Sequence, residues 1–546
     1  MTCVLGIEFS TQSAKSVVLD TVGAEVRHTD QFSYDEEFPR YGTRGGVLPS
    51  DDPARRHTSP LMMVEALDRV FERLLTSPVD LETIAAIKID GQQHCSVYTR
   101  GSYMDRLDRL RTPDPAVPGT PLRRHFEDVF SRKSAPIWED RTTESQAAEL
   151  TEALAAKGGT AALTGNRAEL RFPAAQILQW AAEDPRSYDE TDHILVLSAF
   201  LTSILAGTLA PVDTGDGWGT NLNSLDLASP GWDPGVLAVV NDLLARRGVQ
   251  TTLTEKLGLM DHYDAPVGPI ARYFSTKYGV HPEAMVLAGT GDNPATLLGC
   301  GGRVVMSLGS SYTVNGVMAE VEPSRRGEYN VFGYADGSAM ALSVITNGGK
   351  LHDEFRERYA AASWEEFSRL AAGTDGAPEA TFRPVSPNEP IMLPYRHAES
   401  VPLAPAGIVR EGLDEGDPSA NVRALLLSQA LSLRLHSSHL EKGREIAVVG
   451  GGSRNAVFRR MITDLFGVRT YRIRNADSAA PFGCAVSAAR WAEGLSYKQA
   501  AERYVQREPG SEVDPDTSRR AAYDSLLERY ERLERAHTER VHTQGG

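Results

Sequence analysis

The sequence predicts an α/β protein with more than one domain. Its 546 residues exceed the size at which a single hydrophobic core keeps growing, so two or more domains are expected. Short apolar runs typical of strands alternate with segments whose apolar residues recur every three or four positions, as in amphipathic helices. A strand–turn–strand pattern at the N-terminus also recurs near mid-chain, as duplication of a domain would produce.

The chain begins with a predicted β-hairpin. Residues 3–7 (CVLGI) and 16–20 (SVVLD) are apolar strands joined by the polar turn EFSTQSAK. Residues 301–321, GGRVVMSLGSSYTVNGVMAEV, again place a Gly/Ser turn between two apolar strands. The likeness is only a few residues deep, but its spacing of about half the chain favours two related domains.

Strands and helices alternate through the rest of the chain. TIAAIKIDG, HILVLS, AMVLAG and EIAVVGGG are predicted strands; PLMMVEALDRVFERLL, ALLLSQALSLRLHSSHLEKG and NAVFRRMITDLFG are predicted helices, the last stopped by Gly467. Residues 373–390, rich in Pro and Gly, are expected to form a surface excursion. The C-terminal segment predicts a docked helix, because one face carries Tyr523, Leu526, Leu527, Tyr530 and Leu533.

Charge and composition exclude several classes of protein. With 57 basic and 73 acidic residues, the net charge of −16 argues against a nucleic-acid or anionic-membrane partner. The N-terminus, MTCVLGIEFSTQ, lacks the basic flank of a signal peptide, and no segment approaches the roughly 20 apolar residues of a membrane span. The four cysteines are far apart and form no CxxC pair, which suits buried thiols in a reducing compartment. A cytoplasmic protein is expected.

Asp292 is the first residue that indicates chemistry. It lies in GTGDNPATLLGCG, residues 289–301, between a predicted strand and a predicted helix. Asn293 and Pro294 form a good helix start, because Asn caps an orphan N–H and Pro suits the first helical position. In one interpretation, Asp292 only favours the positive end of that helix.

The alternative interpretation makes Asp292 a general base. Since Asn293 supplies the cap, Asp292 is not needed for it. Gly289 and Gly291 would let a ligand approach the backbone, and the carboxylate lies at the C-terminal end of a strand. This stretch alone does not decide between the two interpretations.

Three turns rich in glycine and hydroxyl residues are candidate phosphate-binding loops, because their backbone N–H groups can hold an anion. They are Ser10-Thr11-Gln12 with Lys15, Gly309-Ser310-Ser311, and Gly450-Gly451-Gly452-Ser453. Each alone is better explained as a tight turn. The third lacks the last glycine of a Rossmann fingerprint, where Asn455 stands, and the chain has no Walker A sequence, no GxSxG elbow and no metal-binding His or Cys motif.

Other polar side chains follow predicted strands. Glu8 lies among apolar residues just before the first turn, where a carboxylate is costly unless it is paired or bound to a metal such as Mg²⁺. Gln93 and His94, in DGQQHCSVY, follow a strand at a position where parallel sheets bind ligands. Trp138 and Asp140, in IWEDRTTE, combine an aromatic ring with a hydrogen-bonding group, as a polyol site requires. Taken singly, each also has a purely structural explanation.

The order of these motifs resembles that of the FGGY carbohydrate kinases, and most closely their longer, animal-type xylulokinase branch. The resemblance runs from Gly6 to about residue 490. It rests on GIEFSTQSAK, GQQH, IWEDRTTE, GNRAELRF, DTGDGWGTN, GTGDNPA, SLGSS, TNGG and VVGGGSRN. YGTRGGV, TSPLMMVEALD and LTGNRA also look like that branch.

The resemblance implies two actin-like ribonuclease-H-type domains, each with a central mixed sheet, around a deep cleft. The N-terminal domain, residues 1–299, would bind the sugar, and the C-terminal domain, residues 300–546, would bind ATP. The implied reaction transfers the γ-phosphoryl of MgATP to the terminal hydroxyl of a ketopentose, D-xylulose first among them. The implied partners are therefore a small-molecule sugar and a nucleotide.

The resemblance also implies roles for individual residues. Asp292 matches the catalytic base. His94, Arg167, Asp292 and Asn293 match positions that contact the sugar, beside Gln93, Trp138 and Asp140. Ser10, Thr11, Gln12 and Lys15 form the first phosphate hairpin and Gly309, Ser310 and Ser311 the second; Asn347, Gly348, Gly451, Gly452, Ser453 and Asn455 match the nucleotide side.

Glu8 departs from the family pattern, which usually has Asp in the first hairpin. Its extra methylene moves the carboxylate by about 1.5 Å, one C–C bond length. Either Glu8 reaches Mg²⁺ with one bridging water fewer, or metal positioning and rate suffer. Two other functions therefore stay open: a kinase of another ketose or a polyol, and a nucleotide- and sugar-binding sensor with little turnover. The sequence does not decide the oligomeric state, for which a homodimer is the commonest default.

Overall fold

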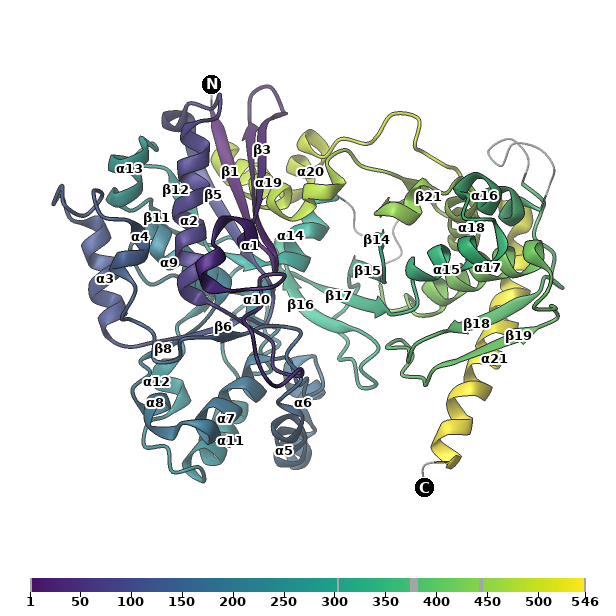
Figure 1. Ribbon diagram of the computed structural model, residues 1–546, viewed down its shortest axis with the longest axis horizontal. Helices are drawn as coiled ribbons and strands as arrows, with labels where there is room; N and C mark the ends of the chain where they lie inside the picture. Colours follow the sequence, from purple (N-terminus) through teal and green to yellow (C-terminus); the bar gives the residue numbers. More distant parts are fainter. Residues whose placement is uncertain (1, 302–303, 374–381, 441–444, 545–546) are drawn as a thin grey trace. The chain divides into compact units, whose positions relative to one another are not determined.

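The computed structural model describes residues 2–301, 304–373, 382–440 and 445–544, and the chain divides into two compact units (Figure 1). Unit 1 comprises Met1–Gly299, Glu320–Met340 and Ser478–Val505; unit 2 comprises Cys300–Ala319, Ala341–Asp477 and Gln506–Gly546. The chain first leaves unit 1 after residue 299, where the sequence predicts a domain boundary. The sequence patterns did not predict the two later segments of unit 1.

The centre of unit 1 is a mixed sheet with strand order β11-β12-β5-β1-β2-β3 and with β13 beside β5. Its strands are β1 (Cys3–Phe9), β2 (Ser13–Asp20), β3 (Glu25–Ser33), β5 (Ile84–Gly91), β11 (Pro266–Pro269), β12 (Met285–Leu287) and β13 (Thr290–Gly291). β1 is antiparallel to β2, whereas β1, β12 and β13 are all parallel to β5. The carboxyl ends of β1, β5 and β13 therefore meet at one edge, the place where such sheets bind ligands.

Helices cover both faces of this sheet. α2 (Pro60–Leu75) and α9 (Leu197–Ala206) share one hydrophobic cluster with the odd-numbered residues of β1, Leu5, Ile7 and Phe9. Because side chains alternate along a strand, Gly6 and Glu8 point to the other face. There α19 (Ala479–Glu493) packs so closely that a Cβ at Gly6 would lie 1.9 Å from the Pro481 carbonyl oxygen.

A second hydrophobic cluster in unit 1 is mainly helical. It includes α5 (Glu144–Leu154), α7 (Pro173–Glu183) and α11 (Pro234–Ala245), together with β6 (Ser96–Thr99) and β8 (His193–Val196). These elements lie together below the sheet in Figure 1. They support the segments that carry Trp138 and Arg167.

Unit 2 is built on the same plan. It contains five successive strands of a six-stranded sheet, in the order β17-β15-β14-β20-β21. β14 (Val304–Leu308) is antiparallel to β15 (Tyr312–Val317) and parallel to β20 (Glu445–Val449). β21 (Arg469–Tyr471) is parallel to β20, and β17 spans Ser338–Ile345. The order matches β3-β2-β1-β5-β12 of unit 1, so the predicted repeat of the hairpin reflects two units with one strand plan.

The helices of unit 2 pack around a buried central helix, α17 (Pro418–Leu435). α16 (Trp364–Ala372), α18 (Ala456–Phe466) and α21 (Arg520–Gln544) contact it, as does β18 (Ile391–Tyr395) of the two-stranded sheet with β19 (Gly407–Glu411). α15 (Lys350–Tyr359) follows β17 and also contacts α17. The predicted docked helix is α21, whose Tyr523, Leu526 and Tyr530 are buried.

Most predicted elements are present. TIAAIKIDG contains β5 and PLMMVEALDRVFERLL is α2; NAVFRRMITDLFG contains α18, which ends at Gly467 with a φ of 67°. The prediction for ALLLSQALSLRLHSSHLEKG was too long, because α17 ends at Leu435, and residues 441–443 lie outside the described residues. Most of the predicted excursion at 373–390 also lies outside them, at 374–381.

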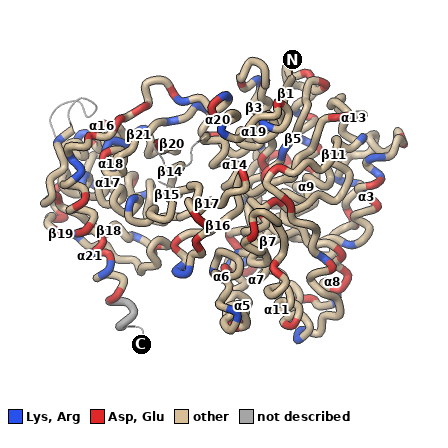
Figure 2. Tube along the Cα trace, turned by 180° about the vertical axis from the view of Figure 1, so that it is seen from behind, with Lys and Arg blue, Asp and Glu red and all other residues tan. Residues whose placement is uncertain are grey.

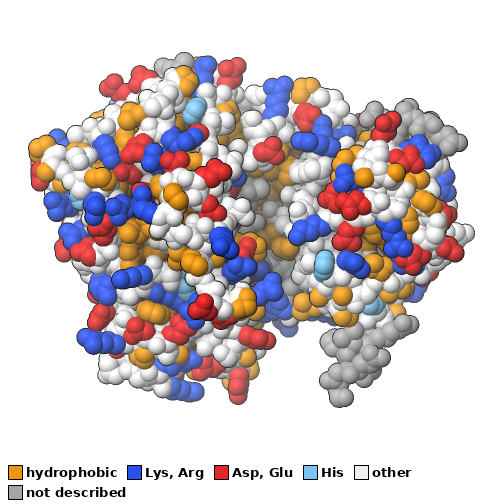
Figure 3. Space-filling view, in the orientation of Figure 1, with side chains coloured by type: hydrophobic (Ala, Val, Ile, Leu, Met, Phe, Trp, Pro, Cys, Tyr) orange, Lys and Arg blue, Asp and Glu red, His pale blue; other side chains and the backbone are white. Residues whose placement is uncertain are grey.

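The surface and the cysteines agree with the composition. Basic and acidic residues are interspersed along the chain in Figure 2, and on the face shown in Figure 3 their side chains are intermixed. Cys3, Cys95, Cys300 and Cys484 are all buried free thiols, as predicted. Among the described residues, every helix is too short or too polar to cross a lipid bilayer.

Candidate active site

Acidic side chains gather at the carboxyl edge of the unit 1 sheet. Glu8 on β1 lies opposite Lys15 on β2 and opposite Asp90 on β5. Asp90 lies opposite Thr290 on β13, two residues before Asp292. Residues that are far apart in sequence are thus brought to one edge by strand register.

Asp292 begins helix α14 (Asp292–Gly299) and is half-buried. Its carboxylate accepts hydrogen bonds from the backbone N–H groups of Gln93 and Asn293, and its Oδ1 accepts one from Asn293 Nδ2 at 2.9 Å. Burial, reinforced by the charge of Glu8, raises the pKa of Asp292 to about 7. A carboxylate with that pKa is well matched to proton abstraction near neutral pH.

Asn293 acts differently from the helix cap that its sequence suggests. Helix α14 begins at Asp292, so Asn293 lies within its first turn. Its Nδ2 donates to Gln93 Oε1 at 2.7 Å as well as to Asp292. The amide therefore orients the carboxylate and the Gln93 side chain together.

The glycines beside Asp292 make room for protein atoms. A Cβ at Gly291 would lie 2.4 Å from Gln93 Cγ, and one at Gly289 would lie 2.5 Å from Thr202 Oγ1 and 2.8 Å from the Ser198 carbonyl oxygen on α9. The described contacts thus explain these glycines by packing against α9 and Gln93.

Gln93 and His94 lie directly after β5 and are buried. His94 adopts a φ of 67°, held by stacking on Phe172 at 4.2 Å and by Nδ1 at 2.8 Å from the Gly219 carbonyl oxygen. A carbonyl requires a donor, so Nδ1 carries the proton and Nε2 is an acceptor. Burial lowers the pKa of His94 to about 3, which keeps the ring neutral and able to accept a hydroxyl hydrogen bond.

Trp138 and Thr11 are brought together although they lie in different motifs. The indole Nε1–H donates to Thr11 Oγ1 at 3.0 Å, and the Thr11 hydroxyl donates to Gln92 Oε1 at 3.0 Å. Trp138 is 44% exposed, so its ring is available to a ligand. The contact joins the segment predicted to bind sugar to the first phosphate turn.

Asp140 is fully buried, and both of its carboxylate oxygens accept hydrogen bonds from the protein. They accept hydrogen bonds from the backbone N–H groups of Arg56, at 2.8 Å, and Thr142, at 2.9 Å, and from the Thr142 hydroxyl at 2.5 Å; His57 Nε2 lies 3.4 Å away. Although burial opposes it, these hydrogen bonds lower the pKa of Asp140 to about 2. Such a carboxylate fixes the backbone around Trp138 rather than facing a ligand.

Arg167 is partly exposed and pairs with Glu169, with Nε 2.7 Å from Glu169 Oε1. The guanidinium lies against Gly327, where a Cβ would be 2.6 Å from Arg167 Cζ. Gly327 has a φ of 70°. The ion pair leaves donors on Arg167 for a polyol.

The turn Ser10–Gln12, which the sequence predicts to bind phosphate and which we call the first phosphate turn, is closed by its own hydroxyl groups and by the loop of residues 41–47. Ser10 Oγ donates to the Ser13 carbonyl at 2.8 Å, and Gln12 is exposed. A Cβ at Gly46 would lie 1.8 Å from the Thr11 carbonyl oxygen, so residues 41–47 pack directly on the turn. Asp35 holds this loop by accepting from Thr43 Oγ1 at 2.7 Å and from the N–H groups of Gly45 and Gly46.

Glu8, Lys15 and Asp90 are the groups nearest to a cation site. Lys15 Nζ lies 2.9 Å from Glu8 Oε2, and Asp90 Oδ1 is buried without a hydrogen-bond partner among the residues that the structure describes. No cluster of three or more acidic, His or Cys ligands occurs in the part of the chain that the structure describes. The donor set fits Mg²⁺ held by one or two carboxylates, water and substrate phosphates.

In unit 2, three sequence motifs converge on one hairpin turn. The turn Gly309–Ser311 joins β14 to β15, and its Gly309 and Ser310 carbonyls accept from the N–H groups of Gly349 and Lys350 at 3.0 and 3.1 Å. Gly450 and Gly452 lie against Leu308, where Cβ atoms would be 2.9 Å from Leu308 atoms. Gly451 is exposed, and no atom of the described residues lies within 4 Å of a Cβ position there, which leaves its backbone open to a ligand.

Three predicted nucleotide-side residues use their side chains within the protein. Asn347 Nδ2 donates to the His397 carbonyl and to Glu399 Oε2, both at 2.9 Å. Ser453 Oγ donates to the Gly450 carbonyl at 2.7 Å, and Asn455 Oδ1 caps α18 by accepting from Phe458 N–H at 2.9 Å. These side chains shape the loops, so contacts to a nucleotide would come mainly from the backbone.

Sequence reasoning missed three residues of these two regions. The sequence does mark Asp90, because it is an acid at the end of the apolar run TIAAIKIDG. Its position opposite Glu8, however, depends on the register between two strands that are far apart in the sequence. No sequence pattern around Asp35 indicated that it would hold the loop against the first phosphate turn. Trp364 begins α16, is 49% exposed and has the Arg356 guanidinium over its ring at 4.5 Å. Ser368 on the same helix accepts from Asn455 Nδ2 at 3.4 Å, so the helix that carries this indole contacts the residue after the third turn.

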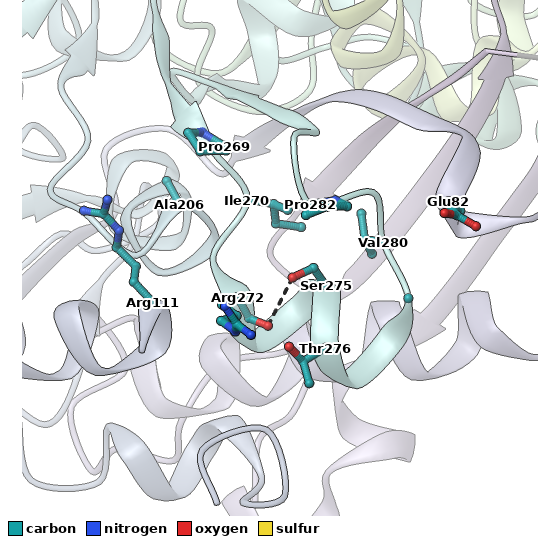
Figure 4. Close-up of a pocket in the computed structure, with 11 residues that line it drawn as sticks. Glu82, Arg111, Ala206, Pro269, Ile270, Arg272, Ser275, Thr276, Val280 and Pro282 are labelled. Atoms are coloured by element: carbon teal, nitrogen blue, oxygen red, sulfur yellow. Dashed lines mark hydrogen bonds between the residues drawn. The ribbon is translucent and has the colours of Figure 1, made fainter. Parts of the chain in front are cut away.

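One cavity of about 620 Å³ in unit 1 lies elsewhere (Figure 4). Glu82 and Pro282 in its wall precede the amino ends of β5 and β12, opposite to the edge that carries Asp292. Arg111 and Arg272 also line it, and Ser275 Oγ donates to the Arg272 carbonyl at 3.2 Å. The cavity is therefore separate from the candidate active site.

Comparisons with known proteins identify the family. A model of the FGGY family of carbohydrate kinases, C-terminal domain, matches residues 298–492. Xylulose kinase 2 of Arabidopsis thaliana is 31% identical over 512 residues, covering 89% of this chain and 86% of that protein. Xylulose kinase of Mus musculus is 30% identical over 550 residues, covering 97% of this chain and 94% of that protein. The chain belongs to the FGGY family of carbohydrate kinases.

Solved FGGY kinases share the fold. The ligand-bound xylulose kinase of Lactobacillus acidophilus matches with a TM-score of 0.76 at 16% identity, covering 98% of each chain. The xylulose kinase of Rhodospirillum rubrum matches with a TM-score of 0.76 at 17% identity, again covering 98% of each chain. The predicted fold, two actin-like ribonuclease-H-type domains, is confirmed. As an FGGY kinase, the chain is a phosphotransferase that acts on an alcohol group and uses ATP.

Proposed function

We propose that this FGGY kinase transfers the γ-phosphoryl of ATP to the terminal hydroxyl of D-xylulose, giving D-xylulose 5-phosphate and ADP. The observation that carries the proposal is Asp292, a half-buried carboxylate oriented by Asn293 and Gln93, with a pKa raised to about 7. The acceptor follows from relatives named xylulose kinase in a plant, an animal and a yeast.

In the proposed reaction, Asp292 removes the proton of the attacking hydroxyl. The hydroxyl oxygen then bonds to the γ-phosphorus while the bond from that phosphorus to the β–γ bridging oxygen breaks, and ADP leaves with the electron pair. Phosphoryl transfer needs mainly positioning and charge stabilisation, to which a general base adds about 10²–10⁴-fold.

The sugar is proposed to bind beside Asp292. Neutral His94 accepts a hydroxyl hydrogen bond at Nε2, and Arg167 donates to hydroxyl or carbonyl oxygens. The Nδ2 hydrogens of Asn293 are used by Gln93 and Asp292, so its Oδ1 accepts from a sugar hydroxyl. The exposed Trp138 indole covers an apolar face of the sugar. Gln93 acts through Asn293, to which it is hydrogen-bonded. Asp140 positions the segment around Trp138 without touching the sugar.

ATP is proposed to use both hairpin turns. In unit 2 the backbone of Ser310, Ser311, Gly451 and Gly452 holds the nucleotide, while Gly348, whose N–H and carbonyl bond to Thr346 and Gln429, supports the hairpin. In unit 1, Ser10, Thr11, Gln12 and Lys15 meet the terminal phosphate. Mg²⁺ would be held by Glu8, directly or through water, with Asp90 as the neighbouring carboxylate. When bound, the metal neutralises charge on the phosphates; the protein residues supply orientation and the base.

A coupled experiment tests the proposal. ADP release is measured over a panel of ketopentoses, ketohexoses and polyols, with Asp292→Asn as the catalytic variant. We expect turnover with D-xylulose that falls at least a hundredfold in Asp292→Asn. Turnover with another sugar and none with D-xylulose would change the acceptor; sugar and nucleotide binding without ADP release would support the sensor instead.

A further inference from the structure

Three buried polar side chains lie beneath the Asn347–Gly349 turn of unit 2. They are Tyr312 at the start of β15, His352 on α15 and Gln429 on α17, and each is at most 4% exposed. Gln429 Nε2 donates to the carbonyls of Asn347, at 2.9 Å, and Gly348, at 3.1 Å. A buried side-chain amide thus holds two successive carbonyls of the turn from below.

These two bonds decide which way the Gln429 amide faces, and through it the arrangement of hydrogen bonds among Tyr312, His352 and Gln429, which we call the trio. Because both N–H groups of Gln429 are used by carbonyls, its Oε1 must be the atom that faces His352 Nε2 at 2.8 Å and Tyr312 Oη at 3.2 Å. An amide oxygen accepts, so His352 carries its proton on Nε2. Tyr312 Oη lies 2.8 Å from the same Nε2, which closes a triangle of three hydrogen-bonding groups.

The turn that the trio supports is the one that contacts the phosphate hairpin. A Cβ at Gly348 would lie 2.8 Å from Ser311 and Tyr312 backbone atoms, and one at Gly349 would lie 2.3 Å from the Gly309 carbonyl oxygen. Gly349 and Lys350 donate from their backbone N–H groups to the carbonyls of Gly309 and Ser310. Two carbonyls of the turn are held by Gln429, and the N–H groups of Gly349 and Lys350 are held by the hairpin, so the turn is fixed on both sides.

Tyr312 makes the connection direct, since it is the residue that follows the hairpin turn. Its backbone pairs with Leu308 across the hairpin, while its hydroxyl reaches His352 and Gln429 beneath the other turn. Glu399 fixes the outer side by accepting from the N–H groups of Thr346 and Asn347 and from Asn347 Nδ2. The carbonyls that face inward are left to Gln429.

We propose that Tyr312, His352 and Gln429 are positioning residues for the nucleotide of the kinase reaction: they lock the Asn347–Gly349 turn to the Gly309–Ser311 hairpin, so that the backbone N–H groups of the hairpin are held in place before ATP arrives. The inference rests on the proposed nucleotide site of unit 2. Preorganised donors bind a phosphate chain without the entropy cost of ordering two loops.

The experiment compares variants by the Kd for ADP in the absence of sugar, by the KM for ATP and D-xylulose, and by the unfolding midpoint. Gln429→Met keeps the length of the side chain but cannot hold the carbonyls. We expect its Kd for ADP and KM for ATP to rise about tenfold, which is the loss of one good hydrogen-bonding unit. The KM for D-xylulose is expected to stay unchanged.

Two matched pairs of variants separate an effect on the position of the nucleotide-binding turns from an effect on the stability of the protein. Tyr312→Phe removes one buried hydroxyl from the trio, and Tyr395→Phe removes one from a buried bond to Glu534 Oε1 at 2.6 Å, elsewhere in unit 2. Only Tyr312→Phe should weaken ADP binding. His352→Gln retains an N–H donor and should bind ADP nearly as the parent does, whereas His352→Leu should resemble Gln429→Met.

The outcomes are distinguishable. If the parent protein binds no ADP, the proposed nucleotide site fails. If the parent binds ADP and the folded Gln429→Met, Tyr312→Phe and His352→Leu variants bind it equally well, the positioning role is overturned. Equal weakening in Tyr312→Phe and Tyr395→Phe would also overturn it, because the effect would then follow stability alone.

Discussion

Glu8 and Asp90 lie directly opposite each other on the adjacent parallel strands β1 and β5, so two carboxyl groups share one face of the sheet. Both are buried, Asp90 completely. Lys15 pairs with Glu8. Within the described part of the chain, Asp90 Oδ1 has no hydrogen-bond partner and Oδ2 accepts only the weak Sγ–H donor of Cys484 at 3.4 Å. Burial first, and then the charges of Glu8 and Asp292, raise the pKa of Asp90 well above its usual value.

Asp90→Asn is therefore expected to stabilise the protein, and increasingly so as pH rises. A carboxyl whose folded pKa is raised binds more protons folded than unfolded, so the parent loses stability as pH rises from its unfolded pKa near 3.8 through the folded value. Asn does not titrate. We expect the variant to gain on the order of 1 kcal/mol in unfolding free energy at pH 8. Urea unfolding of both proteins at pH 5 and pH 8 checks this; a variant less stable than the parent at pH 8 would contradict it.

Local patterns in the sequence were sufficient to predict most helices and strands. They did not predict which residues of neighbouring strands lie opposite each other. The apolar run before Asp292 and the helix after it are β12, β13 and α14, and the Gly/Ser turns are where the sequence placed them. That Glu8 meets Asp90 depends on pairing between residues 82 positions apart in the chain, and no local pattern encodes such a pairing.

Residue type also failed to separate ligand-facing groups from groups that hold the backbone. Trp138 and Asp140 are two residues apart, yet one is 44% exposed and the other is fully buried and saturated with hydrogen bonds. Likewise, the side chain of Asn347 donates to the His397 carbonyl of a loop, and the side chain of Asn455 caps a helix. Asp, Asn and Ser serve equally well in both roles, so only the three-dimensional partners decide.

The activity of the enzyme is expected to depend on the ionisation of Asp292. The base must be deprotonated, and burial together with Glu8 raises its pKa to about 7. We therefore expect kcat/KM for the sugar to rise with pH through the region near 7 and to level off above it. Direct measurement of ADP from pH 5.5 to 9 tests this; a profile flat down to pH 5.5 would mean that Asp292 is ionised throughout and is not held as described.

Gly46→Ala is expected to impair the first phosphate turn. The added Cβ would meet the Thr11 carbonyl oxygen at 1.8 Å, and the φ of 76° disfavours any residue with a side chain. We expect the KM for ATP to rise and kcat to fall, each by tenfold or more, because the turn must move. Steady-state kinetics with ATP as the varied substrate measure both.

Gly42→Ala is the matched control for that variant. Gly42 lies in the same loop with a φ of 66°, but a Cβ there would have no atom of the described residues within 4 Å. Both variants should lose about 1–2 kcal/mol of stability from the left-handed backbone. Equal kinetic defects in the two would show that strain in the loop, and not the contact with Thr11, is responsible.

Trp364 is expected to contribute to nucleotide affinity. Its indole is 49% exposed on α16, and the same helix meets Asn455 through Ser368. Since stacking of a base on an aromatic ring contributes about 1–3 kcal/mol, Trp364→Ala should raise the KM for ATP about tenfold, and Trp364→Phe should raise it less. An unchanged KM in Trp364→Ala, with the fold intact, would exclude the indole from the nucleotide site.

Asp140→Asn tests whether this carboxylate supports the Trp138 segment or binds sugar. Although burial opposes it, hydrogen bonds from Thr142 and Arg56, with His57 Nε2 3.4 Å away, lower the pKa of Asp140 to about 2. The ionised form therefore stabilises the folded state above the unfolded pKa near 3.8, and this contribution is lost as pH falls toward 2. The variant should be about 2 kcal/mol less stable than the parent at pH 7, and about half of that difference should be lost at pH 3. Its unfolding midpoint should not respond to D-xylulose differently from that of the parent, since the side chain is proposed to touch no ligand. A variant of unchanged stability whose D-xylulose affinity collapses would instead make Asp140 a sugar ligand.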